Sequence, residues 1–164
     1  MDAMRIELLQ QMPIFGGIEE GALRFLLEPV PSISVPAGRF FFRERDPADC
    51  MYVLQSGRVA VLKDWAGREM LLRELGAGDC FGEMALLDLF PRSASVRALD
   101  DCRAIALTPA HLYRLFERDA EQFAMIQMNI GREMSRRLRV SDEQLFRATM
   151  GEPQSAPDTV FTTI

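Results

Sequence analysis

The segment between residues 32 and 107 constrains the fold most, because it breaks into short apolar runs separated by turn residues. Its turn signals include Pro36-Ala37-Gly38, Gln55-Ser56-Gly57-Arg58 and Gly76-Ala77-Gly78-Asp79. The apolar runs between the turns are Phe40–Phe42, Met51–Leu54, Val59–Leu62, Met70–Leu75, Ser95–Ala98 and Cys102–Leu107. Many short strands with evenly spaced turns predict a β-sandwich or a small β-barrel.

Helical patterns lie on both sides of this segment. Before it, apolar residues recur at helical spacing until Pro29 and Pro31 interrupt the pattern. After it, Thr108-Pro109 supplies an N-cap residue and a proline at the first helical position. Asp119 with Gln122 then resembles a capping box at the start of a long helix. The apolar stripe of that helix comprises Phe123, Ile126, Ile130, Met134, Leu138 and Leu145.

These patterns predict one domain over residues 1–147 in a chain of 164 residues. The strands should occupy about residues 32–107, with flanking helices at about 18–28 and 109–147. Residues 148–164 contain Gly151 and Pro153, are otherwise largely polar, and are expected to form a loose C-terminal tail.

Composition excludes several kinds of function. The chain carries 19 basic and 24 acidic residues, so its net charge of −5 disfavours nucleic-acid binding through overall charge. Its single histidine excludes a metal site built from several histidines and leaves only His111 for histidine-based catalysis. The three cysteines lack the spacing of a zinc site, and no apolar run is long enough to span a membrane. We therefore expect a cytoplasmic protein with reduced thiols, no metal and no membrane partner.

Residues 78–96 carry the chemistry that points to a ligand. Gly78 and Gly82 allow the backbone to turn tightly and a ligand to approach it. The residues from Glu83 to Leu87 can form one short helical turn, whose first N–H groups favour an anion. Arg92 adds a planar guanidinium that suits a phosphate, and Ser93 adds a hydroxyl. An anion site beside the carboxylate of Glu83 suits a ligand that has a phosphate and a nearby hydroxyl.

Two motifs here, Phe81–Leu87 and Pro91–Val96, resemble the phosphate-binding cassette of the cyclic-nucleotide-binding domain family. That family includes the bacterial catabolite activator proteins and the regulatory subunits of cAMP-dependent kinase. Upstream segments such as Ser56-Gly57-Arg58-Val59 also resemble the family. The resemblance implies a mostly β fold with flanking helices: a double-stranded β-helix (jelly-roll) barrel followed by a long C-terminal helix.

The resemblance also implies a role for each matched position. Arg92 would pair with the cyclic phosphate, and Glu83 would accept a hydrogen bond from the ribose 2′-hydroxyl. The backbone N–H groups expected at the phosphate are those of Gly82, Met84, Ala85, Ser93 and Ala94. The residues expected at the base are Leu72, Arg73 and Ser141. Arg45 departs from the family, which usually has glycine there, and it would be strained if the turn needs a positive φ.

The implied function is a stand-alone regulatory module, not an enzyme, that binds cAMP or cGMP and signals by reorienting its C-terminal helix. Its partner would be an unidentified protein effector, or a second copy through the long helix. We expect no DNA-binding module, because too few residues follow that helix. Two alternatives remain open. The first is a degenerate interaction or scaffold domain that binds no nucleotide. The second is the truncated sensor half of a catabolite-activator-like transcription regulator.

Overall fold

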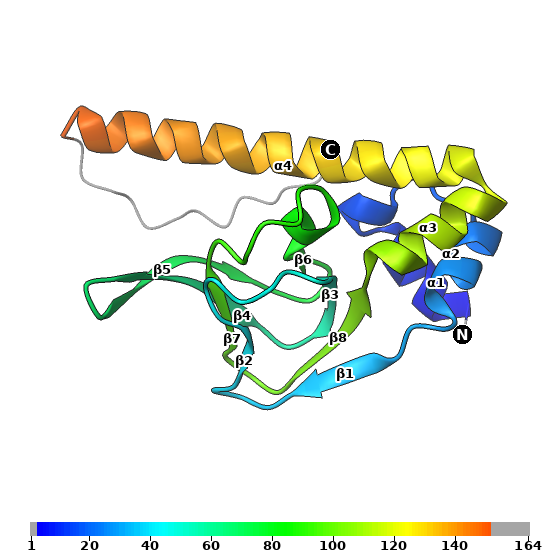
Figure 1. Cartoon of the computed structure of the whole chain (residues 1–164), viewed down its shortest axis with the longest axis horizontal. Helices are drawn as coiled ribbons and strands as arrows, with labels where there is room; N and C mark the ends of the chain where they lie inside the picture. Colours follow the sequence, from blue (N-terminus) through cyan, green and yellow to red (C-terminus); the bar gives the residue numbers. More distant parts are fainter. Residues whose placement is uncertain (1–2, 152–164) are drawn as a thin grey trace. The chain divides into compact units, whose positions relative to one another are not determined.

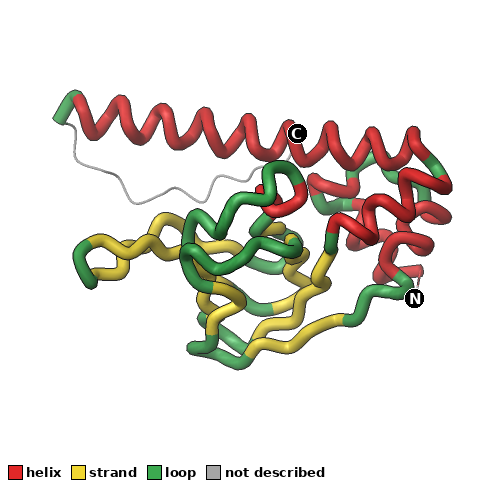
Figure 2. The backbone as a smooth tube through the Cα atoms, viewed as in Figure 1, coloured by secondary structure: helices red, strands yellow, loops and turns green. Residues whose placement is uncertain are grey.

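The computed structural model describes residues 3–151, and they form eight strands together with α- and 3₁₀-helices (Figures 1 and 2). The strands are β1 (Ser32–Val35), β2 (Phe40–Phe42), β3 (Met51–Ser56), β4 (Val59–Trp65), β5 (Arg68–Leu75), β6 (Cys80–Phe81), β7 (Ser95–Ala98) and β8 (Cys102–Leu107). The helices are α1 (Ala3–Gln10), the 3₁₀ turn η1 (Pro13–Phe15), α2 (Glu20–Leu27), the 3₁₀ turn η2 (Glu83–Leu86), α3 (Pro109–Arg118) and α4 (Ala120–Thr149).

The strands pair into two antiparallel sheets of four. One sheet has the order β1-β8-β3-β6 and the other the order β2-β7-β4-β5. All six runs predicted from the sequence contain a strand. β1 and β6 were not predicted as separate strands, because β6 has only two residues and β1 shows no alternation of buried and exposed positions. The predicted combination of antiparallel β-sheets with helices before and after them in the chain is confirmed, but the described helices contain more residues than the strands, so the fold is not mostly β.

The core of the β region is filled by side chains from both sheets. Val59 and Val96 face it from the second sheet, whereas Leu54 and Ala104 face it from the first. Phe41, Phe42, Tyr52 and Phe81 form a contacting aromatic cluster, with ring centroids 5.0–6.1 Å apart. Because one buried cluster contains residues of both sheets, the sheets pack against each other and fix the positions of the loops that leave them.

The helical region confirms the expected flanking helices and adjusts their bounds. The predicted helix at 18–28 is α2, and the predicted helical stretch at 109–147 contains the two expected helices, α3 and α4, with Asp119 in extended backbone between them. Thr108 caps α3 as expected, and the His111 ring accepts a hydrogen bond from the Thr108 backbone N–H. His111 is thus part of a helix cap.

The described residues divide into two compact units, 3–130 and 131–151, with the division inside α4. The predicted boundary between residues 147 and 148 falls within α4, which continues to Thr149. Residues 152–164, the greater part of the predicted tail, lie outside the described residues. No helix of the described part is both long and apolar enough to cross a membrane.

Asn129 joins the first part of α4 to the N-terminal helices. Its side chain is buried, and its amide donates to the carbonyls of Ile14 at 3.1 Å and Gly16 at 2.8 Å. These two carbonyls surround the end of η1, so one amide satisfies backbone acceptors that are far from α4 in sequence.

We predict that Asn129→Leu lowers the free energy of unfolding by about 1–3 kcal/mol, since it leaves these carbonyls without their donor. Urea denaturation measures the change, and Met128→Leu, at an exposed neighbouring position, is the matched control. Equal urea midpoints for the two variants would contradict the prediction.

Candidate functional site

The candidate site begins where β6 ends at Phe81 and the chain turns into η2. Gly82 makes this turn with φ of +74°, a left-handed conformation that costs glycine no steric energy. A Cβ at this position would lie 2.6 Å from Nη1 of Arg92. Glycine is therefore required at position 82 for two reasons: it adopts the left-handed backbone angle, and it leaves the space that the Arg92 side chain occupies.

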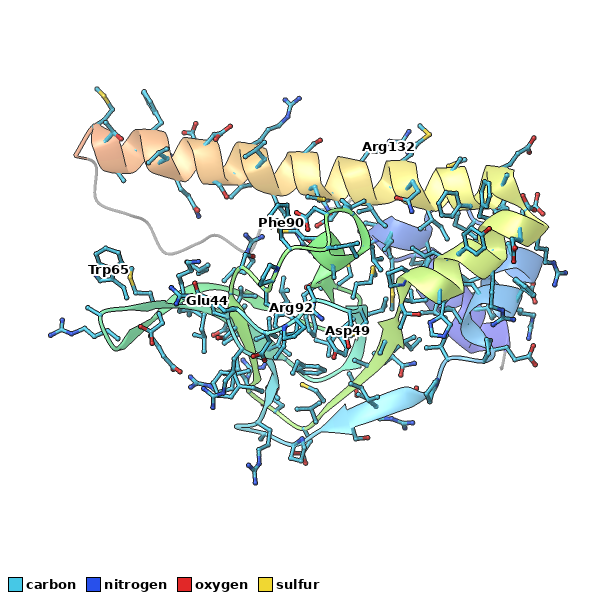
Figure 3. All side chains as sticks on the ribbon, viewed as in Figure 1. Glu44, Asp49, Trp65, Phe90, Arg92 and Arg132 are labelled. Atoms are coloured by element: carbon cyan, nitrogen blue, oxygen red, sulfur yellow. The ribbon has the colours of Figure 1, made fainter. Side chains whose placement is uncertain are left out.

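Arg92 is a buried cation, with its side chain only 3% exposed. Its Nη1 donates to the Gly82 carbonyl at 3.3 Å, and its Nη2 lies 3.4 Å from a carboxylate oxygen of Asp49 (Figure 3). Its Nε is buried and has no hydrogen-bond partner within residues 3–151. The guanidinium carbon lies 4.0 Å from the centre of the Phe42 ring. These hydrogen bonds are long for a charged donor, so the guanidinium retains unused capacity for an anion.

The backbone of Arg92 is fixed from both sides by the turn that follows β2. Its N–H donates to the Asp46 carbonyl at 2.9 Å, and its carbonyl accepts from the Arg45 N–H at 2.8 Å. Arg45 has φ of +73°, so the strain expected for this departure from the family is present. The turn nevertheless keeps its bonds to Arg92, and the substitution therefore leaves the attachment of Arg92 intact.

The remaining cassette residues surround η2. Glu83 is buried at its first position, and Met84 is exposed. The Ala85 N–H donates to the Gly82 carbonyl at 3.1 Å, so it forms part of the turn itself. Ser93 lies across from η2, with its hydroxyl 3.9 Å from the Met84 sulfur. Short chains of contacts thus link the cassette residues Gly82, Glu83, Met84, Arg92 and Ser93.

The residues predicted at the base lie on other elements. Arg73 of β5 pairs with Val61 of β4, whose side chain packs on the core, so both occupy the inner face of their sheet. Leu72 is largely exposed, at an irregularity in the pairing of β4 and β5. Ser141 lies on α4 in the unit of residues 131–151, where its hydroxyl donates to the Arg137 carbonyl. The proposed roles of these residues stay predictions.

Sequence reasoning did not identify the contacts that Asp49, Cys50 and Phe42 make with Arg92. These residues lie 42–50 positions earlier in the chain, so only folding brings them to Arg92, and no spacing motif announces them. Burial raises the pKa of the Cys50 thiol, and burial together with its hydrogen bond to Cys50 raises the pKa of Tyr52. Both groups therefore stay protonated at neutral pH, so neither is an activated nucleophile.

No group of three or more histidine, cysteine, aspartate or glutamate side chains within residues 3–151 is arranged to hold a metal ion. The site therefore consists of one buried arginine, one buried carboxylate and a tight glycine turn, which together suit an anionic ligand.

Similarity to known proteins shows the family of this chain. A sequence model of the cyclic nucleotide-binding domain matches residues 32–119, more than half of the chain. The chain belongs to the cyclic nucleotide-binding domain family. It is 31% identical over 140 residues to the CRP-like cAMP-activated global transcriptional regulator of Mycobacterium tuberculosis, a match that covers 85% of this chain and 61% of the regulator. It is 33% identical over 99 residues to the cAMP-dependent protein kinase regulatory subunit of Emericella nidulans, covering 60% of this chain and 24% of that subunit.

Solved structures agree with this family assignment. The catabolite activator protein of Thermus thermophilus superposes with a TM-score of 0.74 at 30% identity, over 84% of this chain and 63% of that protein. A cyclic nucleotide-binding domain from Methylobacillus flagellatus gives a TM-score of 0.78 at 23% identity, over 93% and 84%, and this likeness supports the fold alone. The chain spans less than two thirds of the length of the Mycobacterium regulator, the kinase subunit and the Thermus protein.

The strain at Arg45 gives a testable consequence. Arg45→Gly should raise the free energy of unfolding by about 0.5–1 kcal/mol, because glycine adopts a positive φ without strain, although it adds some entropy to the unfolded chain. Arg45→Ala removes the same side chain but keeps the strain, and it should change stability by no more than about 0.5 kcal/mol. Thermal or urea unfolding distinguishes the two variants, and equal stabilities would refute the explanation.

Proposed function

We propose that this chain binds a 3′,5′-cyclic purine nucleotide, with cAMP as the first candidate and cGMP as the second. The observation that carries the proposal is the buried guanidinium of Arg92 beside the left-handed turn at Gly82. Its hydrogen bonds are long, and its Nε has no hydrogen-bond partner among the residues that the structure describes. A buried cation without a strong partner is costly, and a phosphate can supply the missing charge and acceptors. Membership of the family supports the same ligand.

The parts of the nucleotide are assigned to separate residues. The phosphate would lie against Arg92 and the backbone N–H groups of Gly82, Met84, Ser93 and Ala94, and the Ala85 N–H would join them on leaving the Gly82 carbonyl. The carboxylate of Glu83 would accept from the ribose 2′-hydroxyl. The base would lie against Leu72, Arg73 and Ser141. Arg73 makes cGMP an essential comparison, since an arginine can donate to both acceptors on one edge of guanine.

Signalling is proposed to pass through the helices. In this scheme the two sheets form a jelly-roll barrel, and ligand binding at the cassette changes the state of α4. Leu138, Val140, Leu145 and Phe146 are exposed large apolar side chains on α4. They offer a surface for a protein effector or for a second copy of the chain. The chain acts as a regulator without catalysis in this proposal, and its cytoplasmic location stays a prediction.

Two alternatives make different predictions. A degenerate scaffold domain would retain the fold but show no response to any nucleotide, and the intact Glu83 and Arg92 argue against it. A sensor portion of a transcription regulator would bind the nucleotide as proposed and have its DNA-binding portion elsewhere. The 61% coverage of the Mycobacterium regulator is compatible with this second alternative. The neighbouring reading frame would distinguish a sensor portion from a separate module.

Isothermal titration should show saturable binding of cAMP, and weaker or no binding of linear AMP. Arg92→Met should reduce the affinity for cAMP by roughly 10–150-fold, because a charge-assisted hydrogen bond contributes about 1.5–3 kcal/mol. Arg97→Met is the matched control, since Arg97 lies on β7 and forms an ion pair with Glu69. No heat and no thermal shift with either cAMP or cGMP would refute the proposal.

The role of Glu83 can be tested separately with 2′-deoxy-cAMP, which lacks the hydroxyl that the carboxylate would accept. Glu83→Gln should reduce the affinity for cAMP by roughly tenfold and change the affinity for 2′-deoxy-cAMP much less. A loss of the same size for both nucleotides would show that Glu83 acts on the shape of η2 and not on the ribose.

A further inference from the structure

Lys63 of β4 lies outside the cassette, but its ammonium reaches the residue that follows Arg92. Its Nζ donates to the Ser93 carbonyl at 2.7 Å and also lies 2.7 Å from a carboxylate oxygen of Glu44. Glu44 precedes Arg45, in the turn whose backbone is bonded to Arg92 (Figure 3). One lysine therefore joins β4, the turn after β2 and the exit of the cassette.

Glu44 is itself held in place at three points. Its second carboxylate oxygen accepts from the Asp64 N–H at 3.3 Å, and its own N–H donates to the Ser95 hydroxyl at 2.8 Å. The hydrogen bond from Lys63 is the main cause that lowers the pKa of Glu44, so the carboxylate is charged at neutral pH. A fixed anion of this kind restricts the flexible lysine to the geometry that reaches Ser93.

The Ser93 carbonyl matters because of the peptide unit to which it belongs. A trans peptide is planar, and its C=O and N–H point in opposite directions. Fixing the Ser93 carbonyl therefore also fixes the direction of the Ala94 N–H, one of the donors proposed for the phosphate. A cation on the carbonyl also polarises the peptide and makes that N–H a stronger donor.

We propose that Lys63, held by Glu44, is a positioning residue that aims and polarises the Ala94 N–H toward one oxygen of the bound phosphate. This inference rests on the proposed function and deepens it, because it gives the site a preference between the two exocyclic phosphate oxygens. Lys63 acts through the Ser93–Ala94 peptide and not through contact with the nucleotide.

Strand pairing does not need this contact. The register of β4 and β7 is already set by the pairs Val61–Val96 and Leu62–Ser95. The Lys63 side chain is 46% exposed, and exposed ion pairs contribute little to stability. The loss of Lys63 should therefore be visible in ligand affinity before it is visible in folding.

The test uses the two phosphorothioate diastereomers of cAMP, each of which replaces one exocyclic oxygen with sulfur, a poorer hydrogen-bond acceptor. Lys63→Met should weaken cAMP by roughly three- to tenfold and reduce the preference between the diastereomers by a similar factor. Lys63→Arg should restore most of the affinity for cAMP and most of the preference between the diastereomers. Arg58→Met is the control: it removes an exposed arginine paired with Asp100 and should change neither the affinity for cAMP nor the diastereomer preference. All variants should melt within a few degrees of the parent.

A second measurement needs no ligand. Lys63→Met should shift the amide nitrogen resonance of Ala94 in the unliganded protein, since the hydrogen bond to the preceding carbonyl is lost. An unshifted resonance would overturn the proposal.

The remaining outcomes distinguish a failure of the role proposed for Lys63 from a failure of the proposed nucleotide binding. Unchanged diastereomer preference in Lys63→Met, when the parent binds cAMP, would overturn the role of Lys63 and leave the proposed function standing. Equal losses for both diastereomers would mean that Lys63 acts only by its charge, which also overturns it. If the parent protein binds no cyclic nucleotide, both proposals fail.

Discussion

The buried guanidinium of Arg92 is the constraint on which the rest of the site depends. Removing a cation from water is costly unless acceptors compensate it. The acceptors among the described residues are one carbonyl and one exposed carboxylate at 3.3–3.4 Å and the Cys50 sulfur at 3.8 Å. The surroundings are therefore shaped to hold a charge that the protein does not fully neutralise. Gly82 leaves space for it, Phe42 covers one face of it, and the turn at Arg45 fixes its backbone.

This arrangement also joins the two sheets. Gly82 and Asp49 lie next to β6 and β3 of the first sheet, whereas Asp46 and Arg92 itself follow β2 and precede β7 of the second. The contacts of the guanidinium with Gly82 and Asp49 therefore link the segment before β7 to segments beside the first sheet, whereas the contact with Phe42 stays within the second sheet. An anion bound at Arg92 would supply acceptors to a side chain that contacts segments of both sheets.

Local features of this fold could be predicted from the sequence, whereas its tertiary contacts could not. Turn residues and short apolar runs predicted most strands, and the cassette was found because its residues are close together in the chain. The two-residue strand β6 has too few side chains to show alternation, and it exists because β3 supplies its hydrogen bonds. The contacts of Asp49 and Phe42 with Arg92 arise from chain reversals over more than 40 residues, which no local pattern encodes. Arg45 was identifiable because a positive φ follows from the family's glycine, and the structure has that angle.

The two parts of α4 differ in what stabilises them, and this difference bears on how a signal could leave the site. Up to Ile130 the helix contributes buried residues to the first unit, with Asn129 bonded to the backbone around η1. Beyond it, Glu133 pairs with Arg136 and Arg137, and Glu143 pairs with Arg147, one turn apart. Such pairs support a helix weakly compared with packing of an apolar face, while Leu138, Leu145 and Phe146 stay exposed. Pairs within one helix add little to its stability, so this segment is a candidate for the low-stability end of the structure. Under the proposed signalling scheme, this segment and not the packed sheets would be the part expected to change.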